Sequence, residues 1–437
     1  MKRFLIAIVA IGQALAAMCA DVWSLDSCIS YAVSHNLDVR SAEIETASTA
    51  LDLIEVKDRF LPTVSAGASQ SWDFGRGLTA QNTYANRNTS SFGWSARLSL
   101  PLFQGLSALR ELRRARAAQP VSQARLRDTR EQTALGVLSY YFQALYTRSM
   151  TDVARENLTL AREQLSRTRL LVEGGKTAEV EVLQAEAEVA RNEAELVQAE
   201  GDAELALLDL RQALNLDPAI GFDIAPVESA GDGAVIPQVA DIYAAALGTN
   251  SGLRAAEGDV ELARHAISIA RTGYIPQLSL SAGLGSSYYT LSGADNQPFG
   301  RQMRENFSKS IGLTLSVPVF DAFATRNRVR RAQVQLRQAD LALERSRTNL
   351  YKAIEQAHRQ AVTAGATLAS SEAATEAARV ALDAMQKKYD FGRATLTETT
   401  EARTTYVNAL ARLTQARYEQ QLRRRILDFY ADPSTIL

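Results

Sequence analysis

The alternation of apolar and polar side chains is clearest at residues 91–105, which read SFGWSARLSLPLFQG. From Phe92 to Leu100 every second side chain is aromatic or aliphatic, and those between them are mostly serine and glycine. A period of two held over this length predicts a β-strand with one apolar and one small polar face. The surrounding sequence follows helical periodicity instead, so the pattern predicts a strand inside a mostly helical protein.

Three further stretches, at 63–74, 277–290 and 308–317, show the same alternation. Strands of about ten residues with one apolar face match tilted strands that cross a lipid bilayer. A soluble sheet with one buried face is the alternative, but the helical remainder offers no evident second layer to cover four such strands. The side chains expected to face lipid are Trp72, Phe74, Phe92, Trp94, Leu98, Leu278, Leu280, Leu284, Leu313 and Leu315.

Four strands are too few to enclose a lumen, and open sheet edges are not tolerated in lipid. A membrane barrel would therefore have to be assembled from several chains. Two copies would give eight strands around a filled interior, whereas three would give twelve strands around a passage. The strand count favours three or more copies and does not fix the number.

Very long helical patterns follow the strands, at 104–172 and 321–390, and a shorter helix returns after each, at 176–213 and 393–430. At about 1.5 Å per residue each long helix would extend about 100 Å, so it needs lateral partners. Apolar residues at seven-residue spacing, such as Leu158, Leu165 and Val172, predict antiparallel coiled-coil packing.

The two halves of the chain have similar sequences. FLPTVSA at 60–66 reappears as YIPQLSL at 274–280, displaced by 214, and SLPLF at 99–103 reappears as SVPVF at 316–320, displaced by 217. Ordered matches at nearly constant spacing indicate an internal duplication. They predict a first structural repeat at 21–214, a linker rich in Gly, Pro and Asp at 215–238, and a second repeat at 239–437.

The first 20 residues, with Lys2 and Arg3 before an apolar run and small residues near Ala20, read as a secretory signal peptide. Lipid modification of Cys19 is an alternative that Met18 disfavours. Cys28 would then be the only cysteine of the mature chain, so no disulfide framework is expected. The formal charge of -1 gives no support for nucleic-acid binding.

These features together resemble the TolC family of outer-membrane efflux factors. The resemblance is carried by the duplication, by LPLF and VPVF, and by VEGGKTAEVEVLQA and YDFGRATLTETTEA at the helix reversals. It implies a membrane α+β fold: a homotrimeric, twelve-stranded β-barrel with four strands per chain, continuous with a periplasmic α-helical coiled-coil barrel. It also implies that the tube tip stays closed until an inner-membrane transporter and its periplasmic adaptor engage.

The resemblance extends to a gate at the tip of the helices. It implies that Glu398 and Glu401, three residues apart on one helix face, form stacked carboxylate rings that favour cations. Tyr389 and Glu181 resemble a polar link between coils. Well-studied members carry arginine where Ala394 stands here, and Arg393 lies one place earlier, a turn of about 100 degrees on a helix.

The glycines at the two helix reversals, Gly174, Gly175 and Gly392, are the expected contacts with the adaptor, because glycine allows a tight reversal. GGKT at 174–177 lacks the earlier glycine and the strand of a phosphate-binding loop. The three histidines share no metal-ligand spacing, and no nucleophile has a matching base. The sequence predicts no enzyme, no cofactor and no metal site.

Two alternatives stay open from the sequence. A periplasmic coiled-coil scaffold or adaptor without a membrane barrel would share the signal peptide and the heptads. A channel could also serve either expulsion of small molecules or secretion of a polypeptide, and no substrate pocket separates the two. In the main interpretation the protein lies in the outer membrane and extends into the periplasm.

Overall fold

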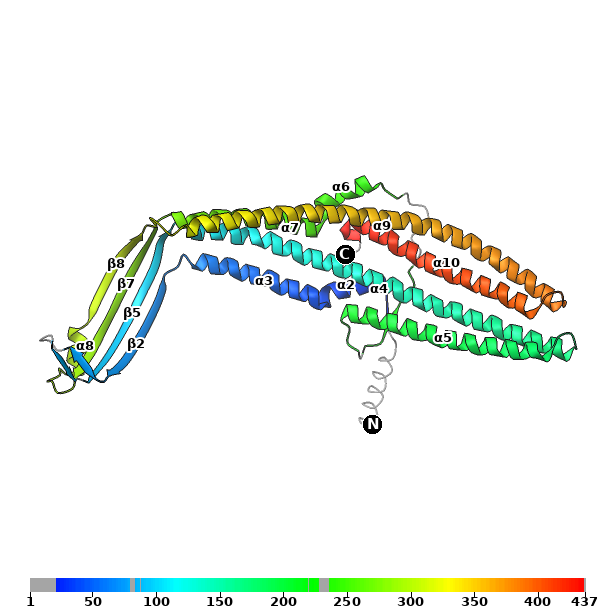
Figure 1. Cartoon of the computed structure of the whole chain (residues 1–437), viewed down its shortest axis with the longest axis horizontal. Helices are drawn as coiled ribbons and strands as arrows, with labels where there is room; N and C mark the ends of the chain where they lie inside the picture. The colour runs from blue at the N-terminus through cyan, green and yellow to red at the C-terminus, as the bar shows by residue number, and fades with distance from the viewer. Residues whose placement is uncertain (1–20, 79–82, 87, 219, 228–235, 436–437) are drawn as a thin grey trace, which may run out of the picture. The chain divides into compact units, whose positions relative to one another are not determined.

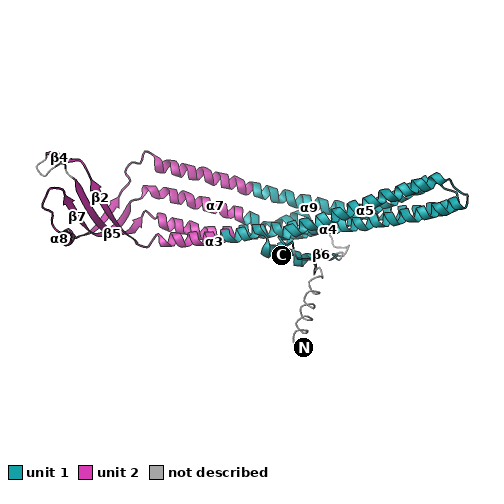
Figure 2. Ribbon diagram, turned by 90° about the horizontal axis from the view of Figure 1, so that it is seen from below, with its two compact units in different colours: residues 1–44, 124–254, 345–437 teal, residues 45–123, 255–344 magenta. Residues whose placement is uncertain are grey.

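The computed structural model describes residues 21–78, 83–86, 88–218, 220–227 and 236–435. The expected signal peptide and Cys19 lie outside these residues. The chain divides into two compact units, shown in Figure 2: unit 1 holds residues 1–44, 124–254 and 345–437, and unit 2 holds residues 45–123 and 255–344. Four helices, α3, α4, α7 and α9 in Figure 1, contribute residues to both units.

The helices occur in matched pairs, one in each half of the chain. The members of a pair have equal lengths in three cases: 11 residues, 67 residues and 36 residues. The order and the lengths confirm the internal duplication. The pairs are α2 (Leu25–His35) with α6 (Val239–Thr249), α3 (Leu37–Asp58) with α7 (Ser251–Ala270), α4 (Ser107–Glu173) with α9 (Ala324–Asp390), and α5 (Glu179–Leu214) with α10 (Leu396–Ala431).

An asparagine interrupts the first helical segment of each half. Asn36 caps the end of α2, and its side-chain oxygen accepts the N–H of Asp38 at 2.8 Å. Asn250 caps the end of α6, and its side-chain oxygen accepts the N–H of Leu253 at 2.8 Å. Each amide thus ends one helix and begins the next. In the first half, α3 therefore begins immediately after Asn36.

Four strands form one antiparallel sheet in unit 2, in the order β2-β5-β7-β8. The strands in the middle of this order are continuous neighbours over most of their length, whereas β2 and β8 lie at the edges (Figure 1). In the first half β5 is six residues longer than the alternation at 91–100 indicates. The bounds are β2 (Thr63–Asp73), β5 (Thr89–Gln104), β7 (Gln277–Leu291) and β8 (Ser308–Ser316).

The register aligns the apolar positions of all four strands on one face of the sheet. Val64 lies opposite Leu98, and Leu98 lies opposite Ala282. Ala282 in turn lies opposite Ile311. Residues directly opposite one another in an antiparallel pair share a face. The sheet therefore has one continuous apolar face, and serine, glycine and threonine dominate the other.

Short elements complete the two units. β1 (Asp21–Trp23) pairs in parallel with β6 (Phe222–Ile224), which lies within the range expected to be a linker. β3 (Arg76–Leu78) pairs with β4 (Tyr84–Asn86) in the loop after β2. The loop between β7 and β8 contains α8 (Phe299–Glu305). Two 3-10 turns lie at Arg271–Tyr274 and Pro433–Thr435.

The core of unit 1 lies where β1 and β6 meet α2, α4 and α5. Tyr141 on α4 is fully buried, and its hydroxyl donates to the carbonyl oxygen of Ala225 at 2.6 Å and lies 3.0 Å from that of Trp23. Burial raises the pKa of the Cys28 thiol to about 12, so this thiol is a packed apolar group. Among the described residues, no helix combines the length and apolar composition needed to cross a bilayer.

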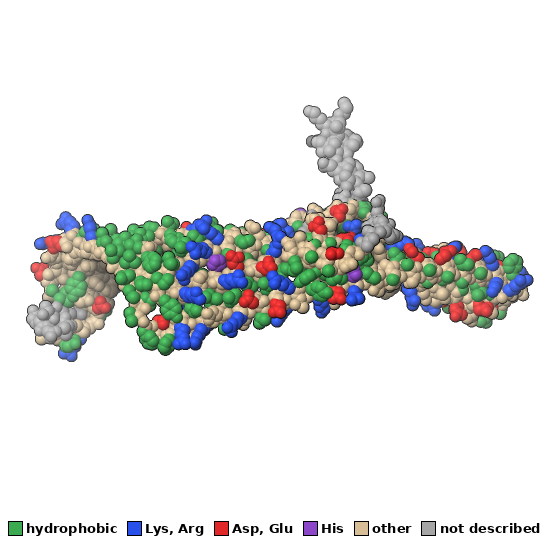
Figure 3. All heavy atoms as spheres, turned by 90° about the horizontal axis from the view of Figure 1, so that it is seen from above, with side chains coloured by type: hydrophobic (Ala, Val, Ile, Leu, Met, Phe, Trp, Pro, Cys, Tyr) green, Lys and Arg blue, Asp and Glu red, His purple; other side chains and the backbone are tan. Residues whose placement is uncertain are grey.

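The strand-to-helix connection has the same unusual backbone in both halves. Gly105 and Leu106 have φ of 59° and 65°, and Ala322 and Phe323, 217 positions later, have φ of 49° and 64°. Left-handed φ is unfavourable for residues with a side chain. Leu106 and Phe323 are nevertheless exposed. In the space-filling view hydrophobic side chains gather over the residues that join the sheet to the long helices, whereas charged ones are spread along the helices (Figure 3).

Candidate functional site

The two long helix reversals in unit 1 have the same turn. Gly175 and Gly392 have φ of 65° and 67°, the left-handed conformation that glycine adopts without strain. The N–H of Lys176 donates to the carbonyl of Leu171 at 2.8 Å, and the N–H of Arg393 donates to that of Lys388 at 2.8 Å. These bonds close each long helix with a glycine cap. The glycines are exposed, as is Phe391 beside Gly392 at 78%.

Tyr389, near the end of α9, is buried among helices from both halves of the chain. Its hydroxyl donates to Glu181 Oε2 on α5 at 3.3 Å and lies 3.0 Å from Thr168 Oγ1 on α4. Its ring packs with Ala185 and Leu396. Burial raises the pKa of the Tyr389 hydroxyl, so the group stays a neutral donor. The structure thus brings Tyr389 and Glu181 together in a hydrogen bond between α9 and α5.

Ala394 and Arg393 have different environments. Ala394 is half-buried and packs against the cluster of Tyr389, Ala185 and Leu396. Arg393 is exposed, and it pairs with no carboxylate among the residues that the structure describes. The one-residue shift therefore removes the arginine from the position of Ala394, and an apolar contact occupies that position.

Glu398 lies in the first turn of α10 and takes part in a capping box. Its Oε2 accepts the N–H of Thr395 at 2.7 Å and the Thr395 hydroxyl at 2.9 Å, and its own N–H donates to Thr395 Oγ1 at 3.2 Å. The hydrogen bonds from Thr395 lower the pKa of the Glu398 carboxyl. Glu401 lies one turn further along and is exposed. Both carboxylates are therefore on the accessible surface of a single chain.

An ion pair between Arg403 on α10 and Glu188 on α5 is absent from the sequence expectations. Arg403 Nη2 binds Glu188 Oε1, and the two side chains are 5% and 17% exposed. The spacing contains the signal: Arg403 follows the buried Leu396 by seven residues, and Glu188 follows the buried Ala185 by three. Charged residues at heptad core positions indicate a specific contact between helices.

The side chains expected to face lipid lie on the apolar face of the sheet or directly after it. Phe92 lies opposite Tyr288, and Leu98 lies opposite Ala282. Phe74 follows the last residue of β2. The loop helix α8 packs on this face, where the ring centroids of Phe299 and Tyr288 are 4.9 Å apart. The other expected residues on the face are Trp72, Trp94, Leu278, Leu280, Leu284, Leu313 and Leu315.

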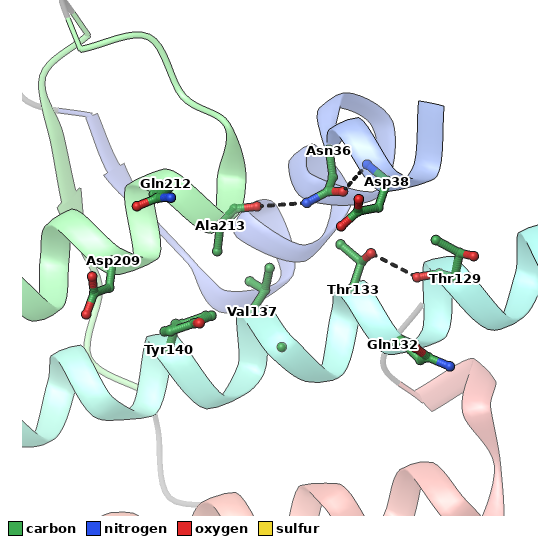
Figure 4. Close-up of a pocket in the computed structure, with 11 residues that line it drawn as sticks. Asn36, Asp38, Thr129, Gln132, Thr133, Val137, Tyr140, Asp209, Gln212 and Ala213 are labelled. Atoms are coloured by element: carbon green, nitrogen blue, oxygen red, sulfur yellow. Dashed lines mark hydrogen bonds between the residues drawn. The ribbon is translucent and has the colours of Figure 1, made fainter. Parts of the chain in front are cut away.

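A pocket of about 510 Å³ lies in unit 1 between α3, α4 and α5 (Figure 4). Two of its polar side chains bind the backbone: Asn36 Nδ2 donates to the carbonyl of Ala213 at 3.2 Å, and Thr133 donates to that of Thr129 at 2.8 Å. Asp38 and Asp209 lie toward opposite ends of it in Figure 4. The described residues contain no cluster of three or more His, Cys, Asp or Glu that could hold a metal.

A family model described as outer membrane efflux protein matches residues 28–216 and 242–431, one segment in each half of the chain. The outer membrane efflux protein BepC of Brucella suis is 23% identical over 350 residues, 80% of this chain and 73% of BepC. The outer membrane protein TolC of Escherichia coli is 23% identical over 391 residues, 88% of this chain and 77% of TolC.

Solved structures show the same fold. The channel protein CusC superposes with a TM-score of 0.78 at 15% sequence identity, and the match covers 93% of this chain and 91% of CusC. Crystal structures of CusC concern the conformational changes that accompany its folding and the formation of its transmembrane channel. Because the match covers 93% of this chain, it includes strands of the sheet as well as helices.

Proposed function

Because the chain belongs to the outer membrane efflux protein family, we propose that three copies form a passive exit duct from the periplasm to the outside. The match to the family model confirms the resemblance that the sequence shows. The family is one of efflux proteins rather than of enzymes, and its members lie in the outer membrane. In this proposal the repeats at 21–214 and 239–437, joined by 215–238, each supply two strands to a twelve-stranded barrel.

The observation that carries this proposal is the single apolar face of a sheet whose edge strands, β2 and β8, each pair on one side only and have no partner on the outer side among the described residues. Lipid tolerates neither an open edge nor a polar outer face. Pairing β2 of one copy with β8 of the next removes both edges. Three copies give twelve strands, enough to leave a passage lined by the serine- and glycine-rich face.

The proposed gate lies at the helix reversals of unit 1. Glu398 and Glu401 would line the narrowing as two carboxylate rings, and the bond between Tyr389 and Glu181 would hold the coils together while the gate is closed. Arg393, being exposed, is free to contact a neighbouring copy. A periplasmic scaffold would need neither the apolar sheet face nor these rings, so that alternative has no support.

The partners in this proposal are a periplasmic adaptor and an inner-membrane transporter. The exposed turns with Gly174, Gly175 and Gly392 are the proposed adaptor contacts, and the exposed ring of Phe391 supplies an apolar anchor there. The duct itself needs no cofactor, since it is passive. Whether it conducts small molecules or a polypeptide depends on the transporter that it meets.

Electron microscopy of the detergent-extracted protein tests the assembly. Side views should show particles longer than about 100 Å, since a helix of 67 residues extends about 1.5 Å per residue. End views should have threefold symmetry and a hollow centre. Monomeric or dimeric rods that stay soluble without detergent would contradict the channel.

Replacing Glu398 and Glu401 by glutamine should reduce cation preference and block by divalent cations without loss of assembly. Glutamine keeps the capping box with Thr395, so the substitution removes charge and preserves the start of α10. Because Thr395 lowers the Glu398 pKa, the wild-type preference should persist below the pH at which an ordinary glutamate is protonated. Reversal potentials in planar bilayers measure the cation preference and its dependence on pH. Identical potentials for wild type and variant would remove these residues from the gate.

A further inference from the structure

Arg403 and Glu188 differ from the other contacts between α10 and the α4–α5 pair, because they are charged and largely buried. Ser149 and Tyr418 contribute neutral hydroxyl groups 2.8 Å apart, and Tyr406 donates to the exposed Glu156 at 3.1 Å. Arg403 and Glu188 are instead 5% and 17% exposed. They therefore form the most buried charged link that the described residues show between α10 and α5.

Burial makes this ion pair costly to keep. Removal from water lowers the pKa of the Arg403 guanidinium, and the attraction of Glu188 only partly opposes that effect. The Nε of Arg403 is buried without a hydrogen-bond partner. Arg191, on the exposed surface of α5, binds the second oxygen of Glu188 at 2.6 Å. Arg403 thus has one carboxylate in direct contact, that of Glu188, which it shares with Arg191.

A buried pair of this kind is a poor permanent bond between helices. Well-packed apolar side chains of similar volume often stabilise a buried contact as well or better, because they avoid the desolvation cost of two charges. When an ion pair separates into water, by contrast, both groups recover their hydration, which offsets part of the lost attraction. The pair therefore suits a contact that must be specific when made and must still separate.

A cavity of about 490 Å³ lies beside the pair, between α4, α5 and α10. Its walls include Arg403 and Glu188, the proposed gate residue Glu401, and Leu396 of the Tyr389 cluster. The link, the cluster and the gate carboxylate thus share one region of unit 1. Space next to the pair gives the two side chains room to separate without displacing packed neighbours.

We propose that Arg403 and Glu188 form a releasable latch that positions α10 against α5 in the closed duct and separates when the duct opens. This inference rests on the proposed function, since a latch has meaning only in a gated channel. Both are positioning residues: neither has to touch the transported molecule.

Single-channel recording of purified protein in planar bilayers tests the latch with three variants. E188Q keeps the shape of the side chain and removes its charge, so Arg403 loses its counter-charge, and the open probability should rise about tenfold or more. R403M/E188L replaces the pair by apolar side chains that do not separate readily into water, and its open probability should fall below that of the wild type. R191Q, which removes the exposed contacts of Arg191 to Glu188 and Glu195 and leaves the pair of Arg403 and Glu188 in place, is the matched control and should behave as the wild type.

The outcomes separate the latch from the channel itself. A wild-type protein that gives no conductance at all overturns the proposed function. A conducting wild type with an assembled E188Q variant of unchanged open probability overturns the latch alone. If E188Q does not assemble, R403M/E188L decides: an open probability below that of the wild type supports the latch, and one equal to or above it overturns the latch. A merely structural role would lower the yield of trimers and leave open probability unchanged.

Discussion

Gly285→Ala is expected to abolish the assembled outer-membrane form of the protein. A Cβ at this position would lie 2.6 Å from the carbonyl oxygen of Trp94 and 3.3 Å from the Cα of Ser95. Both obstacles are backbone atoms of β5, so no side-chain rotation relieves the contact. The strand pair β5–β7 also joins the two halves of the sheet. Overpacking of this kind costs about 1–3 kcal/mol in each chain, and a trimer would incur it three times.

Gly67→Ala is the matched control. Gly67 and Gly285 both lie opposite Ser95, on its two sides, so the substitutions fall in the same row and on the same face of the sheet. A Cβ at Gly67 would meet no atom within 4 Å. The amount of heat-resistant trimer in outer-membrane fractions should be near wild type for Gly67→Ala and close to zero for Gly285→Ala. Equal amounts for both variants would show that β5 and β7 do not pair as described.

The parts of the fold with a strong period are visible in the sequence. The alternation at residues 92–100 continues unchanged in the sheet, where Leu98 and Ala282 share the apolar face. The 217-residue displacement appears as two helices of equal length, Ser107–Glu173 and Ala324–Asp390. These patterns are visible in the sequence because a buried face requires an apolar residue at every turn of a helix or at every second position of a strand.

Features that depend on a distant partner are not visible in the same way. β6 has only three residues, and its parallel pairing with β1 joins positions about two hundred residues apart. A strand this short has no period to detect. α8 is held by aromatic contacts such as the one between Phe299 and Tyr288, not by an amphipathic pattern of its own. Both elements require the three-dimensional fold.

At the proposed gate the resemblance indicates residues but not their local chemistry. Glu398 is a gate candidate and also the third residue of the capping box whose N-cap is Thr395, and the pattern Thr395-x-x-Glu398 contains that second role. The heptad spacing from Leu396 marks the position of Arg403, but an arginine in a charged helix is typical of solvated surface. The carboxylate of Glu188 opposite it, on α5, is visible only in the fold.

Exchanging Arg97 and Leu98 tests which face of the sheet meets lipid. Arg97 lies opposite Ser65 and Gly283 on the small polar face, and Leu98 lies opposite Val64 and Ala282 on the apolar face. R97L/L98R keeps the composition and the net charge and moves one arginine to the other face. A lipid-facing arginine near the bilayer midplane costs about 2–4 kcal/mol, and less near the interface. Three copies in one barrel would multiply that cost.

The exchanged variant is therefore expected to lose nearly all insertion, measured as the folded fraction in lipid vesicles and the yield in outer-membrane fractions. R97L alone is the control for loss of the arginine from the polar face, and it should insert like the wild type because leucine imposes no charge on either environment. Normal insertion of R97L/L98R would mean that the apolar face packs against protein rather than lipid. That result would remove the argument for closing the barrel with neighbouring copies, since a sheet covered by protein has no lipid-exposed edges to satisfy.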